Sequence, residues 1–172
     1  YEPMLFALKV VVQFCENKNL CLEILPVSNS KDERKFFQDH FPNISVLEKD
    51  NYNSNYEKVS NESIIAGLGS TFLYETFGRC FRTAFFTFRD HFTKNIHKNF
   101  RFGWPLKLDD EGLFWCNHPD KVKMISILEY LFHASEKNWT KQVEMFRDIM
   151  HFDPGNKTIK GVLRDEGVPV IN

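Results

Sequence analysis

The residues of this sequence best suited to ligand chemistry are a short glycine-rich stretch and the two hydroxyls and the carboxylate that follow it. Apolar residues lead into a Gly-Leu-Gly-Ser-Thr turn (residues 67–71), and Glu75 follows one helical turn later. A glycine such as Gly69 lets the backbone approach an oxyanion, and the Ser70 and Thr71 hydroxyls can cap a helix or donate to a phosphate. Glu75 shares a helix face with Thr71 and can accept hydrogen bonds from ribose or sugar hydroxyls. The same residues also suit an ordinary strand-to-helix turn, and spacing alone leaves both interpretations open.

The turn matches neither of the two well-known nucleotide motifs. The second half of G-x-G-x-x-G is missing, and no Gly-Lys-Ser/Thr follows, as a P-loop requires. An NAD or ATP site is therefore disfavoured.

The elements around this turn alternate between strand and helix. The sequence pattern predicts helices over residues 4–14, 28–41, 71–77, 119–134 and 136–150, and strands over residues 20–27, 44–50, 64–68 and 82–88. Strands that alternate with helices at short spacing indicate a parallel sheet covered on both faces. The fold class expected is α/β, a Rossmann-like three-layer domain with a mainly parallel sheet and C-terminal helices. Residues 153–172 read as a weakly structured tail.

Composition supports one globular domain over residues 1–172 and gives no sign of a charged partner. Hydrophobic residues make up 42% of the 172, with eighteen Phe, and the net charge is −1. A net charge this close to zero gives no overall electrostatic attraction to nucleic acid or acidic membranes. The four cysteines are widely spaced, without a C-x-x-C pair, so we expect free thiols in a reducing compartment and no metal. No apolar run is long enough to span a bilayer.

A second group of candidate ligand-binding residues follows the strand at 82–88. In open parallel sheets, ligands sit at the carboxyl ends of the strands. Arg89, His91, His97 and Arg101 lie in the segment after this strand and are placed to face a negatively charged ligand. The alternative for each of them is an ordinary charge on a solvated loop.

Three segments resemble one family. "GLGSTFLYETFGRCFRTAFF" (67–86), "GLFWCN" (112–117) and "DPGNKTIKGVL" (153–163) are similar to bacterial surface-carbohydrate biosynthesis transferases. These are GT-B glycosyltransferase-like proteins, distantly similar to Kdo transferases and to the glycerophosphotransferases of teichoic-acid synthesis. The resemblance extends over about residues 20–163 and is most specific around Ser70.

The resemblance implies the C-terminal, donor-binding half of a GT-B enzyme. Gly69, Ser70 and Thr71 would then hold phosphate, and Glu75 would hold a sugar or ribose hydroxyl. The donor is a nucleotide-sugar, with a CMP-sugar as one candidate, and neither a metal nor a separate cofactor is needed. The catalytic base would lie on the missing N-terminal GT-B domain, so the chain would be inactive alone. The catalytic residues are unassigned.

One departure concerns the loop before the serine motif. CMP-sugar transferases of this type often carry His-Pro there, whereas the His-Pro pair of this chain comes later, at 118–119. In the equivalent loop, Ser28, Ser30, Lys31 and Arg34 can replace that phosphate grip.

The function expected is donor binding for surface polysaccharide biosynthesis. We expect a cytoplasmic location, at the inner face of the membrane if the acceptor brings the protein there. Two alternatives stay open. One is a different GT-B chemistry, a polyol-phosphate transferase or a nucleotide-sugar epimerase. The other is a non-catalytic interaction module that retains the fold.

Overall fold

The computed structural model describes residues 2–28, 30–48, 56, 58–92, 101–103, 106–147, 153 and 157–167. The helices are α1 (Glu2–Lys18), α2 (Lys31–His40), α4 (Thr71–Gly78), α5 (Lys121–His133), α6 (Glu136–Met145) and α7 (Lys157–Asp165), with a 3-10 turn, η1 (Arg89–Phe92). The strands are β1 (Glu23–Ile24), β2 (Ser45–Val46), β3 (Ile64–Gly67), β4 (Arg82–Phe86) and β5 (Trp115–Cys116).

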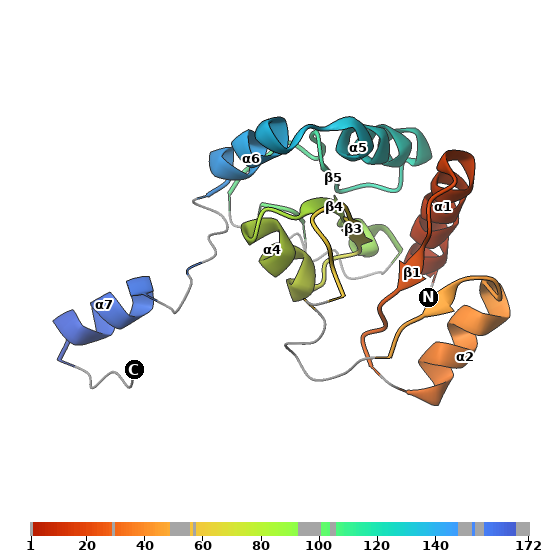
Figure 1. The fold of residues 1–172 in the computed structure, drawn as a ribbon, viewed down its shortest axis with the longest axis horizontal. Helices are drawn as coiled ribbons and strands as arrows, with labels where there is room; N and C mark the ends of the chain where they lie inside the picture. Colours follow the sequence, from red (N-terminus) through yellow and green to blue (C-terminus); the bar gives the residue numbers. More distant parts are fainter. Residues whose placement is uncertain are drawn as a thin grey trace.

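The strands of the described chain form two parallel sheets. β1 pairs with β2, and β4 lies between β3 and β5 in a three-stranded sheet (Figure 1). The expected α/β class with parallel strands is confirmed, and the arrangement is compatible with a Rossmann-like fold. The strands are shorter than the sequence pattern suggested, and they divide into two sheets.

Helices cover both faces of the three-stranded sheet. Alternate residues of β4 point to opposite faces. On one face, the Phe85 ring lies 5.7 Å from the Phe77 ring of α4, measured between centroids. On the other, the Arg82 guanidinium donates to the carbonyl of Ala134, at the end of α5. Figure 1 accordingly shows α4 on one side of β4, and α5 with α6 on the other.

Aromatic side chains fill the space between the sheet, α4 and α6. Phe77, Phe85 and Phe114 are fully buried, and Trp139 of α6 is 2% exposed. The Phe77 and Phe114 rings stack at 5.0 Å, and Trp139 meets Phe77 edge-on at 5.6 Å. Burying each ring contributes about 1.5–3 kcal/mol, so this cluster dominates the core.

The N-terminal helix, α1, packs in the same layer as α5. Ala7, Val10, Val11 and Phe14 form the buried face of α1. The Lys18 ammonium pairs with a carboxylate of α5, that of Glu129, at 2.9 Å, and Figure 1 shows one end of α1 close to α5.

Two elements differ from the sequence-based expectation. β5 was not predicted, because its two residues lie in a turn-rich aromatic stretch and pair with β4 only in the folded chain. Part of the expected tail forms helix α7, in which no residue is buried.

Candidate functional site

The glycine turn joins β3 to α4 as predicted. Gly67 ends the strand, and Ser70 caps the helix, its hydroxyl accepting from the Phe72 amide at 3.3 Å. Gly69 has φ +99°, a left-handed conformation that side chains disfavour. A Cβ at Gly69 would meet Thr87 Cγ2 at an ordinary 3.9 Å, so the requirement for glycine comes from the backbone angle.

The N-terminus of α4 differs electrostatically from those of α2 and α5. Asp120 caps α5, and its carboxylate accepts from two amides of the first turn. The first turn of α2 contains Asp32 and Glu33. By contrast, the α4 cap is a neutral serine, and its first turn has no acidic residue. The positive partial charge at this helix start is therefore not neutralised by its own cap or first turn. Ser70 and Thr71 are exposed there, while Glu75 is half-buried.

A cavity of about 650 Å³ opens at the carboxyl ends of β1, β3 and β4. This is the edge at which parallel α/β sheets bind ligands, and the volume lies within the range of small-molecule sites. Its lining residues are Glu2, Pro3, Met4, Val27, Ser28, Ser30, Glu33, Leu68, Arg89 and Phe92.

Arg89 supplies positive charge to this cavity. Its side chain is exposed, and no ion pair joins it to another described residue. It begins η1, three residues after the end of β4, and Leu68 of the glycine turn lines the same cavity. The structure thus brings Arg89 and the glycine turn to one edge of the sheet.

The loop between β1 and α2 points its donors at a carboxylate of the protein itself. The Glu33 carboxylate accepts from the Val27 amide at 2.9 Å, and from the Ser28 amide and hydroxyl at 2.8 Å each. The Ser30 hydroxyl caps α2 by accepting from the Glu33 amide at 3.1 Å. The loop is therefore built to hold an anion, and Glu33 is the anion it holds here.

The other two predicted residues of this region lie elsewhere. The Arg34 guanidinium donates to the Leu47 carbonyl at 3.5 Å and lies 3.6 Å from the Glu48 carboxylate, so it fastens α2 to the end of β2. Lys31 is exposed at the start of α2. Neither side chain lines the cavity.

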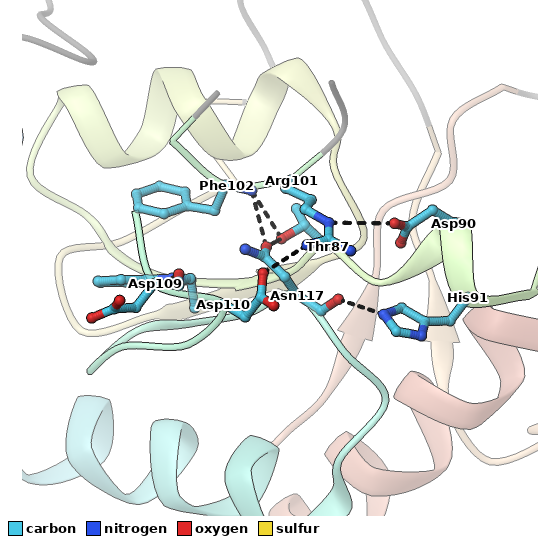
Figure 2. Close-up of polar contacts among 9 residues, drawn as sticks. Thr87, Asp90, His91, Arg101, Phe102, Asp109, Asp110 and Asn117 are labelled. Carbon is cyan, nitrogen blue, oxygen red and sulfur yellow. Dashed lines mark hydrogen bonds and ion pairs between the residues drawn. The ribbon is translucent and has the colours of Figure 1, made fainter. Parts of the chain in front are cut away.

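A buried polar network lies at the ends of β4 and β5 (Figure 2). The Thr87 hydroxyl donates to the side-chain oxygen of Asn117, and the Phe102 amide donates to both side chains, at 3.2 and 3.0 Å. The His91 ring nitrogen Nε2 lies 3.0 Å from the Asn117 carbonyl. Thr87 and Asn117 therefore fix the chain around Phe102 against the sheet, a role that the sequence did not reveal.

Arg101 joins two carboxylates beside this network. Its Nε lies 3.4 Å from Asp90 Oδ2, and its Nη1 lies 2.8 Å from Asp110 Oδ1 (Figure 2). Asp90 is 6% exposed, and its Oδ1 has no hydrogen-bond partner among the described residues. His91 and Arg101 are thus engaged with the protein, whereas no ion pair joins Arg89 to another residue of the described ranges. His97 lies outside the described residues.

The four cysteines are free thiols. Burial raises the pKa of Cys116 above its ordinary value, and burial also raises the pKa of Cys15 and of Cys80. A raised pKa keeps a thiol protonated and weakens it as a nucleophile. These three cysteines are therefore poor candidates for covalent catalysis.

Taken together, the parallel strands and the helices around them define an α/β domain with a cavity at the carboxyl ends of its strands. Residues 1–167 match a family model described as "putative O-antigen biosynthesis protein". The chain belongs to this family, which places it in surface carbohydrate biosynthesis. No curated protein and no solved structure matches the chain. Within the described ranges, no helix is both long and apolar enough to cross a membrane.

Proposed function

We propose that this domain binds a nucleotide-activated sugar donor for O-antigen assembly, as the donor-binding part of a GT-B type glycosyltransferase. The observation that carries the proposal is the cavity at the carboxyl ends of β1, β3 and β4, with Arg89 in its lining. Membership of the O-antigen biosynthesis family supplies the biological context.

The donor's phosphates would sit between Arg89 and the start of α4. The cap and first turn of α4 contain no acidic residue, and no ion pair among the described residues involves Arg89. Backbone amides at a helix N-terminus bind phosphate well, and an arginine adds charge-assisted hydrogen bonds. Gly69 precedes this helix start in a left-handed conformation, and Ser70 and Thr71 are exposed there.

Besides the carboxylates of Glu2 and Glu33, the remaining lining offers groups that suit the uncharged parts of a nucleotide-sugar. Pro3, Met4, Leu68 and Phe92 provide apolar surface for a base or a sugar ring. Phe92 is 37% exposed, which leaves its ring available for stacking. The Ser28 and Ser30 hydroxyls add hydrogen-bonding capacity at the opposite wall.

The reaction would be displacement at the anomeric carbon of the sugar. An acceptor hydroxyl forms the new carbon–oxygen bond while the bond to the phosphate oxygen breaks. The hydroxyl proton passes to a base on another domain. Arg89 and the α4 amides would stabilise the negative charge that develops on the departing nucleotide.

A thermal-stability screen tests the proposal. The chain is heated with CMP, CDP, UDP, GDP or dTDP, and then with their sugar conjugates. A nucleotide at 100 times its dissociation constant should add about 2.7 kcal/mol, or about 5–10 °C. Arg89→Ala should weaken binding at least about tenfold, the loss of one charge-assisted contact. The matched control is Lys137→Ala on α6, which removes an exposed cation outside the cavity lining. A flat response to every nucleotide would overturn the proposal.

A non-catalytic interaction module is the second candidate, because the β1–α2 loop already holds the carboxylate of Glu33. Under that alternative, Glu33→Gln would still bind no nucleotide. Under the donor-binding proposal, removing this competing anion should leave nucleotide binding intact or strengthen it. A polyol-phosphate transferase or an epimerase would use the same cavity, and the identity of the conjugate that binds would separate these chemistries.

A further inference from the structure

A tight antiparallel turn brings three potential metal ligands to one face of the chain. The Gly112 amide donates to the Trp115 carbonyl at 2.9 Å, and the Asn117 amide donates to the Asp110 carbonyl at 2.8 Å. These two bonds flank the facing pair Glu111 and Cys116. In such a pair, the side chains lie on the same face and close together.

His118 completes the group. It comes two residues after Cys116, where the chain bends, and its ring reaches the Glu111 carboxylate. One ligand atom from each of Glu111, Cys116 and His118 lies within 4.8 Å of the other two. His118 Nε2 lies 3.3 Å from Glu111 Oε2. Among the described residues, this is the group with metal-ligand geometry.

We propose that Glu111, Cys116 and His118 form a binding site for one Zn²⁺-type ion. A thiolate, an imidazole and a carboxylate together favour zinc or cobalt over magnesium or calcium, which prefer oxygen alone. Bonds of about 2.0–2.3 Å place tetrahedral ligand atoms roughly 3–4 Å apart. The three side chains therefore need only a small contraction. This inference departs from the sequence analysis, which expected no metal, and it is independent of the proposed donor site.

Burial gives the site a closed base and an open mouth. Cys116 is fully buried, whereas the side chains of His118 and Glu111 are 35% and 47% exposed. An ion would thus enter from solvent and keep its fourth position for water, as in zinc sites with three protein ligands.

Two contacts would have to give way when the ion binds. The Cys116 thiol donates to the His118 carbonyl at 2.9 Å, and coordination would release that proton. The Lys123 ammonium, 3.6 Å from Glu111 Oε1, would lose a partner to the metal. Without an ion, the same residues form an ordinary ion-pair cluster over a buried thiol, which is the alternative that the experiment must exclude.

Cobalt binding distinguishes a metal site from an ordinary ion-pair cluster. The whole chain is treated with a chelator, exchanged into clean buffer and titrated with Co²⁺, and its absorption spectrum is followed. We expect one equivalent to bind, with a thiolate-to-cobalt charge-transfer band and the visible bands of tetrahedral Co²⁺. Zn²⁺ should displace Co²⁺, so that the colour is lost, and it should raise the unfolding temperature.

Variants identify the ligands. Cys116→Ala should abolish the charge-transfer band, and His118→Gln should weaken Co²⁺ binding at least about tenfold. His133→Gln is the matched control, because His133 also pairs with a glutamate but lies outside the group of three. His118 is partly exposed, so His118→Gln decides the question even if Cys116→Ala fails to fold. The proposal is overturned if no charge-transfer band appears, or if His118→Gln binds Co²⁺ as tightly as the unaltered chain.

Discussion

The three-stranded sheet and the β1–β2–α2 unit are built from the same kind of elements, but they are held together differently. Around β4, large aromatic side chains such as Phe77, Phe85 and Phe114 are completely buried. In the smaller unit, the strands have two residues each, and the buried apolar residues include Ile24, Phe37 and Phe41. Hydrogen bonds through Glu33 and Arg34 also hold α2 to the segments that follow β1 and β2.

This difference matters because the cavity takes its walls from both regions. Val27, Ser28 and Glu33 come from the smaller unit, and Leu68 and Arg89 come from the larger sheet. A ligand in the cavity would therefore join a rigid wall to one of lower local stability. Binding sites are often drawn from the less stable parts of a protein, which open locally more easily.

The largest expected effect is the loss of Phe77. Phe77→Ala removes a fully buried ring that meets Phe85, Phe114 and Trp139, and we expect it to lower the free energy of unfolding by about 3–5 kcal/mol. Phe37→Ala, in α2, should lower the global value by less than half as much. Urea denaturation of both variants measures the difference. Equal losses would mean that the two regions form one cooperative core.

The next effect concerns Glu33. Glu33→Gln weakens three hydrogen bonds to a carboxylate, and we expect a loss of about 1–2 kcal/mol, at the low end for charged bonds because the contacts are exposed. Native-state hydrogen exchange should quicken in α2 while the amides of β4 keep their protection. Equal acceleration in both elements would contradict the separation of the two regions.

A smaller effect should follow from the helix caps. Ser30 caps α2 and Ser135 caps α6, each through one hydroxyl that accepts from a first-turn amide. Either serine changed to alanine should lose about 1 kcal/mol. We expect the Ser30→Ala loss to appear in the exchange of α2 alone, whereas Ser135→Ala should shift the global unfolding midpoint. The reverse pattern would contradict the view that β1, β2 and α2 form the less stable unit.

The smallest effect is the pH dependence of the thiols. Burial raises the pKa of Cys116 in the native state, so above about pH 8.5 the unfolded chain loses this proton while the native chain keeps it. Stability should therefore be full below that pH and fall as pH rises toward the native pKa, with a shallower slope in Cys116→Ala. At neutral pH, iodoacetamide should modify exposed Cys21, next to β1, long before Cys116. Rapid labelling of Cys116 would show that the larger sheet opens readily.

Local signals in the sequence predicted much of the fold. The helix after Ser70, its cap and the strand that became β4 follow from short-range patterns, because capping and alternation depend on neighbouring residues. β5 was missed because Trp115 and Cys116 become a strand only through pairing with Phe85 and Phe86. Tertiary contacts also decided how far each strand extends and where the sheet divides.

The candidate sites were less accessible from the sequence. Arg89 and Ser28 were predicted, and both line the cavity, because position at a strand end is a local property. Arg34 was predicted beside them, but a carboxylate and a carbonyl near β2 draw it away. The group of Glu111, Cys116 and His118 has no C-x-x-C spacing to mark it in the sequence, because it depends on a cross-strand pair that forms only in the fold.

The packing of α1 on α5 has a consequence for synthesis. α1 leaves the ribosome before α5, which forms the Lys18–Glu129 pair with it and is made about a hundred residues later, at a separation that makes contact formation slow. Until then, the apolar face formed by Ala7, Val10 and Phe14 stays without this cover. Nascent chains that end before α5 should therefore engage chaperones or aggregate, and those that extend beyond it should not.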